Sequence, residues 1–206
     1  MRVYGDIVFP WLMETLLSRP VYRRQRKALL RQAGGRVLEI GFGFGGSLGE
    51  YPAGRVKEIV ALEPNPGMIR RARPRIDAAG FPVRFVRGVA ERLPFRDRRF
   101  DTVVTHWTLC SLRGLPAGLG EIRRVLHDGG RFLFLEHGLA AEPGVARWQR
   151  RLTPIQRVLA DGCRLDLDIE EVVRSGGFRL ESIERYESEL PLRVLRQMYR
   201  GVARPL

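Results

Sequence analysis

Three closely spaced glycines directly follow a short apolar segment, and this arrangement constrains the fold of the chain most. Gly41, Gly43 and Gly45 come immediately after residues 36–40, whose length and composition are those of a buried strand. Glycine lets a loop turn tightly and approach a ligand without interference from a Cβ atom. Glu63 follows the loop by about 20 residues, where a carboxylate can accept hydrogen bonds from ribose hydroxyls. The sequence therefore predicts a site for a nucleotide-like ligand.

Strand-like and helix-like segments alternate along the rest of the chain. The pattern predicts strands at residues 36–40, 56–62, 83–86, 100–105 and 131–136, and a final pair at 178–186 and 197–203. The predicted helices occupy residues 67–79, 119–126, 145–159 and 169–175, after two N-terminal helices near residues 9–17 and 22–32. This alternation is typical of an α/β fold with a mostly parallel sheet and helices on both faces. We expect a single domain over 1–206, with N-terminal helices in 1–34, a cofactor-binding core in 35–136, and a substrate cap with the last strands in 137–206.

The glycine loop fits two ligand classes, dinucleotides and S-adenosylmethionine. The dinucleotide spacing G-x-G-x-x-G is met only through Gly46. Glu39 stands two residues before the first glycine, and a carboxylate there favours a ligand with a cationic amino group over a diphosphate. Methionine supplies such a group, so the loop favours S-adenosylmethionine.

Several segments, in order, resemble the motifs of class I S-adenosylmethionine-dependent methyltransferases. The first is Glu39-x-Gly41-x-Gly43-x-Gly45, and the others are residues 61–68, 88–95, 99–104 and 123–131. The resemblance implies a Rossmann-like, seven-stranded, mostly parallel sheet whose last strand is antiparallel. Within this superfamily the chain is most similar to methyltransferase-like alkyl-thiol methyltransferases and their small bacterial relatives. That likeness rests on residues 109–112, 134–137, 148–149, 161–163 and 198–203.

The resemblance implies a set of cofactor-binding residues. These are Glu39, Gly41, Phe42, Gly43, Gly45, Glu63, Pro64, Met68, Ala90, Glu91 and Thr105. Two positions depart from the family pattern. Val89 stands where many relatives carry an aspartate for the adenine amino group, so that contact is expected from the backbone or from Glu91. Phe44 replaces a smaller residue and is expected to reshape the methionine end of the site.

Candidate catalytic residues follow the fourth and fifth predicted strands, because ligands of open α/β sheets bind beyond the carboxyl ends of the strands. His106 and His137 stand at these two ends, and histidine is the natural base near neutral pH. Asp161 lies in the predicted cap, where it could orient a histidine or close the site. Cys110 and Cys163 are expected to be packing residues, and two cysteines alone make neither a metal cluster nor a disulfide framework. We expect no metal in the site.

The chain is strongly basic, with a formal net charge of +13. Lys27 and Lys57 are the only lysines among its 36 basic residues, and the arginines are spread along the whole chain. This distribution favours a generally basic surface over a built nucleic-acid site, so no obligatory nucleic-acid partner is expected. The low cysteine content and the short, interrupted N-terminal apolar run predict a cytoplasmic protein without a signal peptide or membrane anchor.

These observations predict S-adenosylmethionine-dependent methyl transfer to a small, apolar acceptor, with thiol sulfur preferred. Three alternatives stay open at this point. The basic, aromatic N-terminal helices are compatible with peripheral membrane contact and with methylation of a phospholipid amine or a quinone. RNA methylation is the second alternative and is motivated by the net charge alone, and a binding protein that keeps the cofactor fold without catalysis is the third. The sequence leaves the acceptor and the oligomeric state open.

Overall fold

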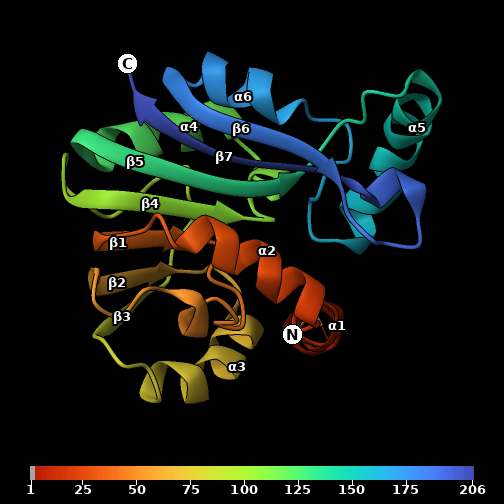
Figure 1. The fold of residues 1–206 in the computed structure, drawn as a ribbon. Coiled ribbons are helices and arrows are strands. Elements are labelled where there is room, and N and C mark those ends of the chain that lie inside the picture. Colours follow the sequence, from red (N-terminus) through yellow and green to blue (C-terminus); the bar gives the residue numbers. More distant parts are fainter. Residues whose placement is uncertain (1–2) are drawn as a thin grey trace.

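The computed structural model describes residues 3–206 and contains one seven-stranded sheet with helices on both faces (Figure 1). The strands are β1 (Gly35–Ile40), β2 (Val56–Leu62), β3 (Val83–Val86), β4 (Phe100–His106), β5 (Leu126–His137), β6 (Phe178–Glu187) and β7 (Gln197–Pro205). The α-helices are α1 (Phe9–Leu17), α2 (Pro20–Leu30), α3 (Pro66–Asp77), α4 (Leu115–Val125), α5 (Pro143–Leu159) and α6 (Ile169–Ser175). A π-helical turn, Tyr4–Val8, precedes α1.

The strand order is β3-β2-β1-β4-β5-β7-β6. The first five strands pair in parallel, whereas β7 lies antiparallel to both β5 and β6. The predicted mostly parallel sheet with an antiparallel last strand is therefore confirmed. The order reverses at β1, because β2 and β4 flank it, and this reversal creates the crevice in which open α/β sheets bind ligands.

Alternate residues of the central strands face two separate cores. One core joins β1 and β4 residues such as Leu38 and Val103 to α4 and α6. The other core joins Val37 and Val104 to α2 and α3. These strands are apolar on both faces, as expected of a parallel sheet covered on both sides. In Figure 1, α1 and α5 instead lie beyond the carboxyl ends of the parallel strands.

The observed elements differ from the predicted ones mainly at their ends. Helix α4 begins at Leu115, four residues before the predicted start, because Pro116 occupies the first turn, where its missing N–H costs no hydrogen bond. Strand β5 begins at Leu126 and includes the Asp128-Gly129-Gly130 segment, which lies between the predicted helix 119–126 and the predicted strand 131–136 and has the composition of a turn. The pairing of β5 with β4 shifts register in this stretch, so the strand absorbs the turn as an irregularity.

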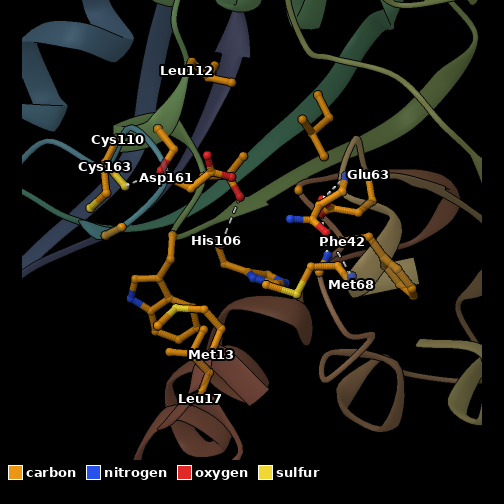
Figure 2. A pocket seen from close by; sticks show the side chains of 18 of the residues that line it. Met13, Leu17, Phe42, Glu63, Met68, His106, Cys110, Leu112, Asp161 and Cys163 are labelled. Carbon is orange, nitrogen blue, oxygen red and sulfur yellow. Dashed lines mark hydrogen bonds between the residues drawn. The ribbon is translucent and has the colours of Figure 1, made fainter. Parts of the chain in front are cut away.

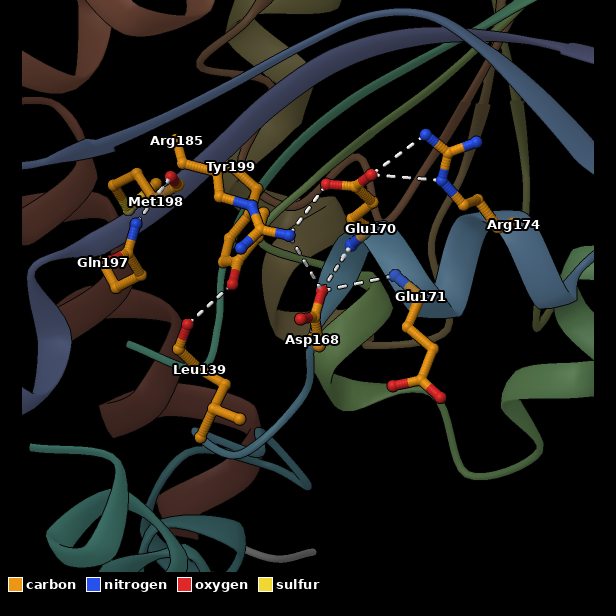
Figure 3. Close-up of polar contacts among 9 residues, drawn as sticks. All are labelled: Leu139, Asp168, Glu170, Glu171, Arg174, Arg185, Gln197, Met198 and Tyr199. Carbon is orange, nitrogen blue, oxygen red and sulfur yellow. Dashed lines mark hydrogen bonds and ion pairs between the residues drawn. The ribbon is translucent and has the colours of Figure 1, made fainter. Parts of the chain in front are cut away.

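Polar contacts fix the segments around the end of β5 (Figure 3). Tyr199 on β7 donates a hydrogen bond to the backbone oxygen of Leu139, at 2.6 Å. Asp168 caps the N-terminus of α6, and Arg185 on β6 binds Glu170 of that helix at 2.8 Å. Tyr199 therefore holds the loop after β5, which begins beside His137, and the contacts of Asp168 and Arg185 hold α6 against β6.

In the part of the chain that the structure describes, no helix is both long enough and apolar enough to cross a membrane.

Candidate active site

A cavity of about 780 Å³ lies at the carboxyl ends of β1, β2, β4 and β5. Its lining comes from widely separated parts of the chain, including α1, the glycine loop, the ends of β4 and β5, and the segments after α5 and β6. Figure 2 shows Phe42, Glu63 and Met68 at one end, the two cysteines at the other, and His106 between them. We call the first end the cofactor half and the second the acceptor half.

The glycine loop forms one wall of the cofactor half. Gly41, Gly43 and Gly45 all adopt positive φ angles, of 72°, 59° and 74°. A Cβ atom at Gly41 would lie 2.2 Å from the Thr108 hydroxyl oxygen, whereas at Gly43 the nearest atom would be 3.9 Å away. Gly41 thus permits close packing on the segment after β4, and Gly43 leaves open space beside the cavity. This open cradle fits the expected cofactor.

Glu63 lies beside the glycine loop in the cofactor half, directly after β2. Its carboxylate accepts hydrogen bonds from the backbone N–H groups of Gly43 and Asn65, both at 2.9 Å. Burial raises the pKa of this carboxyl, and the two backbone donors counteract part of that increase. A carboxylate has about four acceptor positions, so Glu63 can still bind both hydroxyls of a ribose.

Most of the other predicted cofactor residues also line the cavity. These are Phe42, Pro64, Met68, Ala90 and Glu91. The Glu91 carboxylate accepts the N–H groups of Arg113 and Gly114, at 2.9 and 3.1 Å. It therefore fixes the loop before α4 as well as facing the cavity.

Glu39 does not line the cavity. It is fully buried beneath the loop, where its carboxylate accepts hydrogen bonds from Ser47 Oγ at 2.8 Å and Tyr51 Oη at 2.7 Å. His106 Nε2 lies 2.7 Å from the same carboxylate, but the angle of this contact is too bent for a hydrogen bond. A buried carboxylate needs such partners, so Glu39 supports the loop and His106 from outside the cavity lining.

Gly45 and Thr105 are likewise set back from the cavity. A Cβ atom at Gly45 would lie 3.2 Å from the Phe42 ring, so this glycine serves packing within the loop. Thr105 on β4 is fully buried, and its hydroxyl has no hydrogen-bond partner among the described residues. Both residues therefore support the residues that line the cavity without lining it themselves.

An aromatic and basic cluster lines the cavity at the end of β4. Trp107 has a φ of 53°, which is rare for a bulky residue and typical of strained functional positions. Its ring meets the Tyr22 ring edge to face at 5.3 Å, and the Arg26 guanidinium lies 5.8 Å from the same ring. Burial lowers the pKa of Arg26, although the nearby carboxylates of Glu39 and Glu50 oppose that effect. Arg26 is 2% exposed, so it brings a buried positive charge to the cavity wall.

Sequence reasoning missed two contributions to the cavity. Arg26 belongs to no motif of the sequence, and it reaches the cavity only because α2 packs onto the sheet. Helix α1 also lines the cavity, with the apolar side chains Phe9, Met13, Leu16 and Leu17. Its apolar period predicts a buried helix face but does not show that this face contacts a ligand. Glu14 on the same helix pairs with Arg71 and Arg75 of α3, the latter at 2.7 Å, and so attaches α1 across the crevice.

His137, Cys110 and Cys163 meet at the far wall of the acceptor half. His137 Nε2 lies 2.9 Å from Cys163 Sγ, and the sulfur and ring nitrogen atoms of all three residues lie within 4.8 Å of one another. The Cys110 thiol and then the His137 imidazole stabilise the charged form of Cys163, which lowers the pKa of Cys163 to about 4. The same pairing, together with burial, raises the pKa of Cys110 well above its usual range. The two predicted packing cysteines are thus neighbours with different protonation preferences.

Asp161 also lines the cavity, between the two halves. Its φ of 48° makes it another strained position, directly before Gly162. Its negative charge contributes, after burial, to the raised pKa of Glu63. The three predicted catalytic residues, His106, His137 and Asp161, therefore all face one cavity.

Comparisons with known proteins agree with this geometry. Residues 38–134 match the family model described as a methyltransferase domain. The chain is 30% identical over 172 residues to the thiol S-methyltransferase TMT1A of Homo sapiens, covering 81% of this chain and 69% of that protein. It is 33% identical over 138 residues to the ubiquinone/menaquinone biosynthesis C-methyltransferase UbiE of Burkholderia mallei, covering 64% of this chain but only 57% of that protein.

Solved structures share the fold at lower sequence identity. A SAM-dependent methyltransferase from Thermotoga maritima superposes with a TM-score of 0.67 at 20% identity, covering 97% of each chain. The [4+2]-cyclase SpnF superposes with a TM-score of 0.69 at 19% identity, covering 89% of this chain and 80% of that one. Because a cyclase shares this fold, the fold by itself does not specify the reaction.

The sequence similarity to TMT1A shows the family of the chain. The open glycine loop beside Glu63 also fits the cofactor that this family uses. The chain belongs to the S-adenosylmethionine-dependent methyltransferases.

Proposed function

We propose that the protein methylates the thiol sulfur of a small, apolar acceptor. The observation that carries this proposal is an apolar chamber that adjoins a histidine backed by a buried carboxylate. Apolar side chains from both ends of the chain line the chamber, including Met13, Leu17, Leu112, Leu195 and Met198. The similarity to a thiol S-methyltransferase supports sulfur as the methylated atom.

The cofactor, when bound, supplies a methyl group on a positively charged sulfur that is already a good leaving group. The protein then has to hold the acceptor sulfur in line with that methyl group and keep water out. We assign the binding of the cofactor to the glycine loop and Glu63. Helix α1 and the segment after β6 line the chamber with apolar side chains, which favour an apolar acceptor over water.

A thiol reacts as its thiolate, so the site must take up a proton. We propose that His106 accepts this proton, because its ring faces the cavity and its Nε2 lies 2.7 Å from the Glu39 carboxylate. The Glu39 charge would stabilise the resulting imidazolium and fix the orientation of the ring. The buried guanidinium of Arg26 adds a positive potential that favours the thiolate.

A matched panel of acceptors tests the methylated atom. An alkyl thiol, its alcohol and amine counterparts, a phenol and a quinone would be incubated with cofactor carrying a labelled methyl group. We expect the thiol to be labelled at least about tenfold faster than its alcohol and amine counterparts, since the sulfonium methyl reacts best with a polarisable thiolate. Labelling of another compound while every thiol stays unlabelled would contradict the proposal.

A second candidate function is methylation of a quinone held at a membrane surface. Apolar side chains are exposed on two elements near the cavity: Val3, Tyr4, Ile7, Val8, Trp11 and Leu12 in and before α1, and Ile155, Val158 and Leu159 in α5. Tyr4 donates a hydrogen bond to the Leu159 backbone oxygen, which joins the two groups. We call this surface the apolar rim. The basic face of α2 lies next to it in the sequence, and the UbiE similarity favours this alternative.

Vesicle co-sedimentation tests contact of the apolar rim with lipid. If the rim docks on a bilayer, the protein should sediment with anionic vesicles, and the double variant Trp11→Glu, Val158→Glu should lose most of that binding. Leu206→Glu is the matched control, because Leu206 is also exposed but follows β7, at the opposite end of the sheet from the cavity. Equal sedimentation of all three proteins, or none for the wild type, would contradict the membrane contact.

A further inference from the structure

Cys110, His137 and Cys163 form a buried cluster for which methyl transfer to a bound acceptor has no evident use. The three residues come from different segments: a 3-10 turn after β4, the end of β5, and the loop after α5. Cys110 is 1% exposed and Cys163 is 7% exposed, and all three residues line the acceptor half of the cavity. No other cysteine occurs in the chain.

The backbone holds the two cysteine segments together. The Arg164 N–H donates a hydrogen bond to the Cys110 oxygen at 2.9 Å. Gly162 has a φ of 94°, and a Cβ atom there would lie 3.2 Å from the Ser111 oxygen. The positive φ and this close approach both favour glycine at position 162, where the loop after α5 meets the turn after β4 and brings the two sulfur atoms together.

The geometry points to a binding site for a four-coordinate, thiophilic cation of the zinc class, formed by Cys110, His137 and Cys163. Two thiolates and one imidazole make up the protein ligands of one class of catalytic zinc site, in which the fourth position stays open. Zinc–sulfur and zinc–nitrogen bonds of about 2.3 and 2.0 Å place tetrahedral ligand atoms roughly 3.5–3.8 Å apart. The ligand atoms here lie within 4.8 Å of one another, so side-chain shifts of the order of 1 Å would accommodate the ion.

A divalent ion would also balance the charge of the two sulfur ligands in their deprotonated form. Two buried thiolates are costly in an apolar wall unless a cation neutralises them, and a divalent ion cancels both charges. The 2.9 Å contact between His137 Nε2 and Cys163 Sγ shows that the ring nitrogen already points at the sulfur. An ion would take the place of the proton that these two atoms share.

The open position of such an ion would face the acceptor half, because all three ligand residues line that half of the cavity. This consequence rests on the proposed thiol methylation. An acceptor thiol that enters the open position would bind the ion as its thiolate and give its proton to His106, the base assigned above. The sulfur would then gain the methyl group, and the neutral thioether and S-adenosylhomocysteine would leave.

Cobalt substitution tests the site without any activity measurement. Reduced, chelator-treated full-length protein would be titrated with Co²⁺ in the absence of oxygen. We expect one tightly bound ion per chain, with a thiolate-to-cobalt charge-transfer band and the intense visible bands of four-coordinate cobalt, and Zn²⁺ should abolish both. Absence of these bands in protein whose two thiols are free and reduced would overturn the proposal.

Single-ligand variants locate the ion. Cys110→Ser, Cys163→Ser and His137→Asn should each weaken zinc binding by at least about 100-fold, beyond the 10–100-fold typical of outer-shell partners. His127→Asn is the matched control, because His127 lies on the same strand but is exposed to solvent, and it should bind as the wild type does. Binding of S-adenosylhomocysteine by each variant checks that the fold is retained. Equal zinc affinity in all four variants would overturn the site, as would a Cys110–Cys163 disulfide in protein kept under reducing conditions.

Addition of an acceptor thiol to the cobalt-loaded protein distinguishes a failure of the ion site from a failure of the proposed function. Addition of a thiol that the enzyme methylates should shift the cobalt bands, since its sulfur would enter the open position. Thiol methylation by protein that shows no cobalt bands would overturn the ion site and leave thiol methylation standing. Cobalt bands in a protein that methylates no thiol would support the ion site and contradict thiol methylation.

Discussion

Replacement of Glu63 by alanine is expected to weaken binding of S-adenosylhomocysteine by at least about 100-fold while the protein stays folded. The carboxylate has room for two ribose hydroxyls beside the two backbone N–H groups that it already accepts. Hydrogen bonds to a charged group contribute about 1.5–3 kcal/mol each, and two such bonds correspond to a loss of this size. Isothermal titration calorimetry measures the affinity directly.

Glu58→Ala is the control for this variant. Glu58 lies on the same strand, where it pairs with Arg36 far from the cavity lining, so its loss should leave the affinity within about twofold. Because burial raises the pKa of Glu63, wild-type affinity should begin to fall above the ordinary carboxyl range as the pH is lowered. The alanine variant should lack this step. Unchanged affinity in Glu63→Ala would contradict the assignment of the cofactor half.

Gly41→Ala is expected to destabilise the protein and to abolish cofactor binding. A left-handed conformation costs a non-glycine residue about 1–2 kcal/mol, and the new methyl group would in addition lie 2.2 Å from the Thr108 hydroxyl. For a chain of this size, a loss of at least about 2 kcal/mol lowers the melting temperature by at least about 4 °C. Thermal unfolding and calorimetry with S-adenosylhomocysteine measure the two effects.

Alanine substitutions at two nearby glycines distinguish the effect of backbone strain at Gly41 from the effect of steric overlap. Gly43→Ala introduces the same kind of backbone strain at a φ of 59°, but without overlap, so it should cost about 1 kcal/mol and still weaken binding, because the methyl group enters the cradle. A Cβ atom at Gly49 would meet nothing within 4 Å, and Gly49→Ala should change neither stability nor binding. Similar stability of Gly41→Ala and Gly49→Ala would show that the close approach at Thr108 does not hold the loop.

The sequence was most informative where function depends on local chain geometry. The glycine loop and Glu63 could be placed beforehand, since a strand, a tight turn and a carboxylate at the end of the next strand are linked by short-range rules. The order of strands and helices followed from the same alternation. His106 and His137 could also be placed at the cavity, because the carboxyl ends of parallel strands share one edge of the sheet.

Side chains whose partners are distant in sequence were the least predictable. Glu39 follows the expected motif, yet Ser47 and Tyr51 turn its carboxylate into the protein interior. Arg26 reaches the cavity only through the packing of α2 beside Trp107. The two cysteines are separated by more than 50 positions and show no metal-ligand spacing, and the third member of their cluster, His137, lies at the end of β5. Such contacts depend on tertiary packing, which no local pattern encodes.

A crystal structure with bound S-adenosylhomocysteine tests the central claim, that one cavity holds the cofactor at one end and the acceptor at the other. We predict that the ribose hydroxyls bind Glu63, that the amino-acid tail follows the Gly41–Gly45 loop, and that the cofactor sulfur points toward His106 and the acceptor half. A cofactor bound away from Glu63, or a sulfur that faces away from the acceptor half, would contradict the account.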